Sequence, residues 1–70
     1  MNQNLKQKID HAPRSAGVYL MKDSRGRVLY VGKSKDLKSR ISAYFSGTDS
    51  RFMIPFLVSH IKDIDFIVTE

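Results

Sequence analysis

The feature that most constrains this chain is a pair of apolar runs separated by a short polar segment. Residues 18–22 and 27–32 contain the branched and aromatic side chains that are typical of β-strands. The four residues between them, Asp23-Ser24-Arg25-Gly26, have the composition of a tight turn. The pattern therefore predicts a β-hairpin. Centring the turn on its middle peptide bond places Tyr19 directly opposite Tyr30, with both side chains on one face of the sheet.

The size of the chain limits what can stabilise that hairpin. Its 70 residues make one small domain at most, and such domains bury only about 60% of the surface that they expose when unfolded. The chain has no cysteine, which excludes disulfides and a thiolate zinc site. Its apolar content of 41% still suits a globular domain. We therefore expect a single domain over residues 1–70 that depends on its core, on a partner or on further sequence.

The sequence on both sides of the hairpin predicts helices. Residues 3–11 have the apolar spacing of a short helix, with Leu5, Ile9 and Ala12 at i, i+4 and i+7. A second helix is expected from Ser34, a good N-cap, to about Phe45. Its apolar arc consists of Leu37, Ile41, Tyr44 and Phe45, with Arg40 at the edge. A third helix fits about residues 51–61, and residues 63–69 alternate as a third strand. The resulting order of helix, strand, strand, helix, helix, strand predicts an α+β fold.

Positive charge is concentrated in the middle of the chain. The net charge is +5, and clustered lysine and arginine side chains favour a polyanionic partner such as DNA. Seven of the basic residues fall within nineteen positions: Lys22, Arg25, Arg27, Lys33, Lys35, Lys38 and Arg40. No signal peptide is visible, and no apolar run approaches the roughly 18 residues of a membrane span. We therefore expect a cytoplasmic protein without membrane contact.

Five residues between Gly17 and Phe45 suit phosphodiester chemistry. Tyr19 and Tyr30 share a sheet face, while Arg40 and Tyr44 lie one turn apart on the second helix. Arginine holds a phosphate with two parallel hydrogen bonds, and Lys33, expected near the helix start, adds a point charge. A phenol can orient an attacking water, or act as its base if its pKa is lowered. Taken singly, each residue also has an ordinary interpretation, because buried tyrosines usually pack in cores and helix cations usually face solvent.

The spacing of these residues resembles a known pattern. Gly17-Val18-Tyr19 and Tyr30-Val31-Gly32 resemble the paired tripeptides of the GIY-YIG nuclease family, with valine in place of isoleucine in both. The helix residues that follow, from Lys33 to Tyr44-Phe45, and the later stretch 61–69 also fit the members that act in nucleotide excision repair. The resemblance covers nearly the whole chain.

The resemblance implies a fold, an activity and partners. The fold would be a three-stranded antiparallel sheet flanked by helices, and the reaction would cut one DNA strand on the 3′ side of damage with Mg2+ or Mn2+. Tyr19 would lie nearest the attacking water, Tyr30 and Tyr44 would hydrogen-bond the water network or the phosphate, Arg40 would stabilise the phosphate charge, and Lys33 would hold the strand or the hydroxide. The partners would be DNA and the other subunits of an excinuclease.

One part of the family pattern is missing from this sequence. The metal ligand of the family is a glutamate on a helix after the third strand, whereas Glu70 follows that strand directly, about two turns too early. We therefore expect the glutamate beyond residue 70 and a chain truncated at this end, which alone cuts poorly or not at all. Two other classes stay open: a non-cutting DNA-binding module of the same fold, and a small interaction domain whose tyrosines are core.

Overall fold

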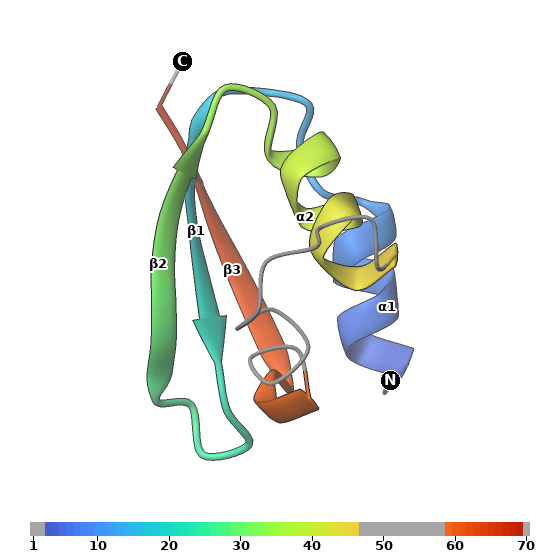
Figure 1. Ribbon diagram of the computed structural model, residues 1–70, viewed down its shortest axis with the longest axis vertical. Coiled ribbons are helices and arrows are strands. Elements are labelled where there is room, and N and C mark those ends of the chain that lie inside the picture. Colours follow the sequence, from blue (N-terminus) through green and yellow to red (C-terminus); the bar gives the residue numbers. More distant parts are fainter. Residues whose placement is uncertain (1–2, 47–58, 70) are drawn as a thin grey trace.

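The computed structural model describes residues 3–46 and 59–69. Its elements are α1 (Gln3–Asp10), β1 (Gly17–Lys22), β2 (Val28–Ser34), α2 (Leu37–Ser46) and β3 (Asp63–Val68). The strands form one antiparallel sheet in the order β2-β1-β3. Both helices lie on the same side of this sheet, α2 against β1 and β2, and α1 against β3 (Figure 1). The predicted α+β fold with a three-stranded antiparallel sheet is confirmed.

The third predicted helix can be compared with the structure only at its end. Residues 51–58 lie outside the described residues, whereas Ser59 and His60 are helical and Ile61 follows as a buried residue. The described helices include none long and apolar enough to cross a membrane.

The hairpin forms as predicted, but its register differs from the predicted one. Tyr19 lies opposite Gly32, and Tyr30 lies opposite Met21. Two extra residues cause the difference. Gly26, at a φ of 80°, extends the turn, and the pairing then shifts between Met21 and Lys22 at a β-bulge. Because the total shift is two residues, Tyr19 and Tyr30 remain on one face, as predicted, but as diagonal rather than direct neighbours.

Asp23 organises the turn of this hairpin. Its carboxylate accepts hydrogen bonds from the backbone nitrogens of Arg25 (2.9 Å) and Arg27 (3.0 Å) and from the Arg27 side chain (3.0 Å). The Gly26 nitrogen donates to the Asp23 carbonyl at 3.1 Å. These bonds to Arg27 and Arg25 lower the pKa of Asp23. The side chain thus takes the place of backbone partners, as aspartate commonly does in turns.

The start of α2 also differs from the prediction. Strand β2 continues to Ser34, so the helix begins only at Leu37, and Ser34 is not its N-cap. Asp36 has that role: its carboxylate accepts a hydrogen bond from the Ser39 nitrogen at 3.2 Å. The Ser34 hydroxyl instead accepts from the Asp36 nitrogen at 3.1 Å, which fixes the turn between strand and helix.

The core lies between the helices and the covered face of the sheet. Its side chains come from α1, α2, β1, β3 and the segment that precedes β3. They are Leu5, Ile9, Tyr19, Met21, Leu37, Ile41, Tyr44, Ile61 and Ile64. Burying an aliphatic side chain of this size stabilises the fold by about 1.5–3 kcal/mol relative to leaving it exposed. Of the apolar residues predicted to face inward, Leu5 and Ile9 in α1 and Leu37, Ile41 and Tyr44 in α2 are buried, whereas Phe45 is only partly buried against the core.

The other face of the sheet is open in the part of the chain that the structure describes. Side chains alternate between the two faces of a strand. On the second face Leu29 is accordingly 40% exposed, Val31 54% and Ile67 55%, whereas Val18 and Leu20 on the central strand are half-buried. We call these two surfaces the covered face and the open face.

Ion pairs connect α1 to the end of the sheet near the hairpin turn. The Lys8 ammonium lies 2.7 Å from the Asp63 carboxylate and 3.8 Å from that of Asp65. Lys22 on β1 pairs with the same Asp65. The hydrogen bond from Lys8 lowers the pKa of Asp63 and raises that of Lys8. These pairs are partly exposed, so they contribute modestly to stability.

Candidate active site

Three polar side chains from β1 and α2 form a hydrogen-bonded series on the covered face. The Arg40 guanidinium donates to the Tyr44 hydroxyl at 3.1 Å, and that hydroxyl lies 3.1 Å from the hydroxyl of Tyr19. Tyr19 and Tyr44 are each only 2% exposed. The guanidinium carbon also lies 4.5 Å from the centre of the Tyr44 ring. We call Tyr19, Tyr44 and Arg40 the tyrosine–arginine cluster.

Tyr30 borders this cluster and connects it with solvent. Its ring centre lies 6.1 Å from that of Tyr19, and its side chain is 39% exposed. The rings of Tyr19 and Tyr44 meet edge to face, with their centres 5.9 Å apart. All three tyrosines of the chain are therefore gathered at one place, with Tyr30 at the exposed side.

The environment of Tyr19 keeps its phenol protonated. Burial is the main cause, and the hydrogen bond with Tyr44 adds to it, so that the pKa of Tyr19 is raised well above its ordinary value. The interaction with Arg40 lowers that pKa, but by less. At neutral pH the cluster thus holds a neutral phenol beside a permanent positive charge.

The position of α2 relative to β1 is set by the segment that precedes β1. The Leu37 nitrogen donates to the Ser15 carbonyl at 3.1 Å, and the Lys38 nitrogen donates to the Pro13 carbonyl at 3.0 Å. These are nitrogens of the first helical turn, which have no partner within the helix itself. The bonds therefore fix the helix start against β1, and Arg40 and Tyr44 follow on the turns that face the sheet.

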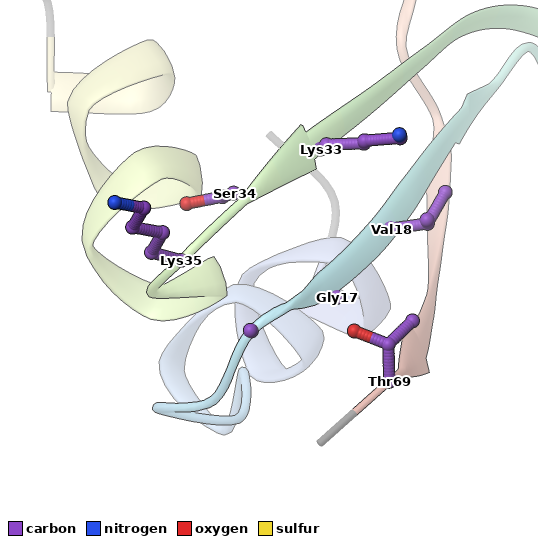
Figure 2. A pocket seen from close by; sticks show the side chains of 7 residues that line it. Gly17, Val18, Lys33, Ser34, Lys35 and Thr69 are labelled. Atoms are coloured by element: carbon purple, nitrogen blue, oxygen red, sulfur yellow. The ribbon is translucent and has the colours of Figure 1, made fainter.

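Lys33 does not join the cluster. It lies on β2 opposite Val18, whereas Tyr19 lies opposite the neighbouring Gly32, so Lys33 belongs to the open face. Figure 2 shows its side chain extending on the same side as that of Val18, beside a hollow at this end of the sheet. The hollow is lined by Ala16, Gly17, Val18, Lys33, Ser34, Lys35 and Thr69. The prediction that Lys33 lies at a helix start is therefore wrong, because β2 is two residues longer than expected.

The residues described here do not form a metal site by themselves. Between residues 3–46 and 59–69, no three histidine, aspartate or glutamate side chains lie together. The carboxylates of Asp23, Asp36, Asp63 and Asp65 are each paired with lysine or arginine. Glu70 lies outside the described residues.

Comparison with known proteins identifies the family. Residues 15–70 match the family model described as a UvrC-like GIY-YIG domain. The chain belongs to this family. It is 71% identical over 68 residues to UvrABC system protein C of Syntrophus aciditrophicus, covering 97% of this chain and 11% of that protein. It is 54% identical over 63 residues to the corresponding protein of Geotalea daltonii, covering 89% and 10%. The chain thus spans about a tenth of the length of these relatives.

Solved GIY-YIG domains share the fold. The N-terminal endonuclease domain of UvrC from Thermotoga maritima, bound to magnesium as its catalytic divalent cation, matches with a TM-score of 0.84 and 27% identity over 100% of this chain and 75% of that chain. Three further structures of the Thermotoga domain are tyrosine-to-phenylalanine point mutants, and each is bound to the catalytic divalent cation. The GIY-YIG resemblance of the sequence is thereby confirmed.

Proposed function

We propose that this chain is the endonuclease domain of a UvrC protein and that its tyrosine–arginine cluster hydrolyses one phosphodiester bond of DNA. The observation that carries the proposal is the series from Arg40 through Tyr44 to Tyr19. A hydrophobic core needs no arginine directed at two buried phenols. A phosphate whose negative charge increases in the transition state does need such a group.

Arg40 supplies the electrostatic part of this chemistry. Its guanidinium is always charged and can offer further donors beside the one that it gives to Tyr44. The Tyr44 ring and hydroxyl hold it in place on α2. A positive charge held in place before the substrate arrives needs no reorganisation when negative charge develops, and this is the basis of electrostatic catalysis.

Tyr19 acts in this proposal as a neutral phenol that orients the attacking water. A general base must be deprotonated near the working pH, whereas burial and the hydrogen bond with Tyr44 raise the pKa of Tyr19 and keep its phenol protonated. A phenol has one hydrogen to donate and two lone pairs to accept. The hydrogen bond with Tyr44 raises the pKa of Tyr19 when Tyr19 is its donor, because the bond then favours the neutral phenol. The lone pairs of the Tyr19 oxygen stay available to accept a hydrogen bond from the attacking water.

The two other predicted residues have supporting roles. Tyr30, the exposed member of the tyrosine group, lies where a DNA strand would first meet the site, so we assign it a hydrogen bond to the water network or the phosphate. Lys33 lies on the open face, so we assign it to holding the strand rather than to the hydroxide. Lysine binds phosphate as a point charge and needs no fixed geometry.

A divalent cation supplies a further part of the chemistry when it is bound. Such an ion lowers the pKa of its water and shields the phosphate. The magnesium of the Thermotoga domain suggests the same ion here, and manganese is a chemically similar hard cation. Because the described residues hold no suitable carboxylate group, we propose that the ligand is a glutamate outside them, as the family pattern suggests.

The wider role follows from the relatives named UvrABC system protein C. We propose that the domain makes the 3′-side incision of nucleotide excision repair in the cytoplasm. Its partners would be damaged DNA and the other components of the UvrABC system. Damage recognition would belong to those partners and to parts of a longer chain.

The proposal is tested by nicking of supercoiled plasmid with and without magnesium or manganese. The 70-residue chain would be compared with a prolonged chain, in which the segment that follows the aligned residues of the Syntrophus relative is joined to residue 70. We expect metal-dependent nicking by the prolonged chain. Salt-sensitive DNA binding without any nicking would instead favour a non-cutting DNA-binding module. Neither binding nor nicking would favour an interaction domain with core tyrosines.

A further inference from the structure

Gly32 occupies a position in β2 where a side chain has no room. It is the cross-strand partner of Tyr19. A Cβ atom added at Gly32 would lie 2.2 Å from both the Cζ atom and the hydroxyl oxygen of Tyr19, and 2.8 Å from its Cε1 atom. The Tyr19 ring therefore lies across the backbone of β2, in the space that a side chain of residue 32 would fill.

The backbone conformation does not explain why this residue is glycine. Among the described residues only Gly26 has a positive φ, so other residue types could adopt the backbone geometry of Gly32. The requirement comes from space alone. Packing of an aromatic ring over a glycine on the neighbouring strand is a known way to stabilise such a pair, and β2 is an edge strand of this sheet.

We infer that Gly32 is a positioning residue, whose missing side chain sets where the Tyr19 hydroxyl lies relative to Tyr44 and Arg40. The clash falls on the hydroxyl end of the ring rather than on its base. The ring is also enclosed on its other sides by Tyr30, Tyr44 and its second cross-strand neighbour, Phe66. A methyl group at residue 32 would therefore push the hydroxyl out of its 3.1 Å contact with Tyr44.

Gly17 provides a matched control on the same sheet. A Cβ atom added there would lie 2.3 Å from the Ile67 carbonyl oxygen and 2.8 Å from the Leu37 Cδ1 atom. That position is equally crowded, but the nearest atoms belong to β3 and to the core side of α2. Gly17→Ala should therefore damage packing without acting first on the Tyr19 hydroxyl, whereas Gly32→Ala should act on it directly.

The test is NMR spectroscopy of the 70-residue chain with 13C-labelled tyrosine Cζ atoms. The chain has three tyrosines, all at this site, so three signals report on it directly, and tyrosine-to-phenylalanine variants assign them. We expect Gly32→Ala to shift the Tyr19 and Tyr44 signals and to abolish the nuclear Overhauser contact between their rings. Gly17→Ala should retain both. Equal changes in the two variants, or an unchanged Tyr19–Tyr44 contact in Gly32→Ala, would overturn the inference.

A double variant keeps the test decisive if Gly32→Ala unfolds. Tyr19→Leu removes the ring atoms that a new Cβ would meet, so Gly32→Ala should lower the melting temperature by less in the Tyr19→Leu background than in the unmodified chain. An equal loss in both backgrounds would show that the ring does not fill this space, and would also overturn the inference. The catalytic importance of Gly32 rests on the proposed function, but neither the NMR nor the melting measurement uses DNA or metal. A prolonged chain that does not cut DNA would therefore refute the function and leave this result intact.

Discussion

The two faces of the β1–β2 hairpin differ in how their polar side chains are buried and paired. On the covered face, Tyr19 is buried and hydrogen-bonded to Tyr44, which is fixed in turn by Arg40. On the open face, Lys33 is exposed, and no described carboxylate lies within ion-pair distance of it. Tyr19 and Val18, or Gly32 and Lys33, are adjacent in sequence and yet lie on different faces. The hairpin thus holds buried, hydrogen-bonded side chains on one face and an exposed lysine on the other.

The largest expected effect comes from removing the charge on the covered face. Arg40→Ala should lower the rate of metal-dependent nicking by the prolonged chain by about 10²–10³, as is typical when one preorganised electrostatic partner is lost. The measurement is the single-turnover nicking rate. Arg40→Lys is the matched variant, because it keeps the charge but loses the planar fork, and it should recover only part of the rate. Full activity of Arg40→Ala would show that the cluster is packing alone.

A smaller effect is expected from removing one hydroxyl of the same cluster. Tyr19→Phe should slow nicking by about ten- to hundredfold, which corresponds to one hydrogen bond to a charged group at about 1.5–3 kcal/mol. Because the pKa of Tyr19 is raised, the phenol stays neutral across the working range. The rate ratio of Tyr19→Phe to the unmodified chain should therefore be the same at pH 6.5 and pH 9. A deficit that grows about tenfold for each pH unit would instead identify Tyr19 as the base.

The open face predicts an effect on binding. Lys33→Gln should weaken DNA binding and reduce the magnitude of the slope of log K against log salt concentration by about 0.9, the value for one lost phosphate contact on duplex DNA. Fluorescence anisotropy of a labelled duplex across a series of salt concentrations measures both quantities. Lys6→Gln, which removes an equally exposed lysine from α1, is the control and should leave the slope of the binding plot closer to its original value. Equal slopes for the two variants would remove Lys33 from the DNA-binding surface.

The smallest effect concerns stability rather than the site. Hydrogen bonding to Lys8 lowers the pKa of Asp63 in the folded state. The pair therefore stabilises the fold fully at pH values above the pKa of Asp63 in the unfolded chain, about 3.9. This stabilisation is lost as the pH falls through the lower pKa of Asp63 in the folded chain. Because both side chains are more than a third exposed, Asp63→Asn should cost only about 0.2–1 kcal/mol at pH 7. Urea unfolding at pH 7 and pH 3 measures the difference, which should shrink at the lower pH. A constant difference would exclude an ionic origin.

The sequence was sufficient to predict α1, α2 and the three strands, because their patterns are local. The apolar spacing of α1 and α2 identified Leu5, Ile9, Leu37, Ile41 and Tyr44 as core residues, and all of them are buried. The turn residues of the hairpin were also found, since Asp23 and Gly26 have strong individual preferences. Tyr19, Tyr44 and Arg40 could be grouped because Arg40 and Tyr44 lie one helical turn apart, whatever the rest of the chain does.

The errors arose where one residue of offset changes the outcome. A bulge adds a residue to one strand without a clear sequence signal, so the direct pairing of Tyr19 with Tyr30 was wrong. The position of Lys33 depended on where β2 ends and α2 begins. That boundary was ambiguous in the sequence, because both Ser34 and Asp36 have suitable N-cap side chains. The sequence contained the signal for Asp36, but pairing of Ser34 across to Gly17 decided between them. The crowding at Gly32 depends on contact between strands and could not be predicted from composition.

The central claim is that chemistry belongs to the covered face and DNA holding to the open face. Its most direct test is the single-turnover nicking rate at saturating DNA and magnesium, measured side by side for Arg40→Ala and Lys33→Gln in the prolonged chain. The account predicts a loss of about 10²–10³ for Arg40→Ala and a nearly unchanged rate for Lys33→Gln, because saturation compensates for weaker binding. A loss of the same size in both variants would contradict it and would place Lys33 in the catalytic site beside the tyrosines.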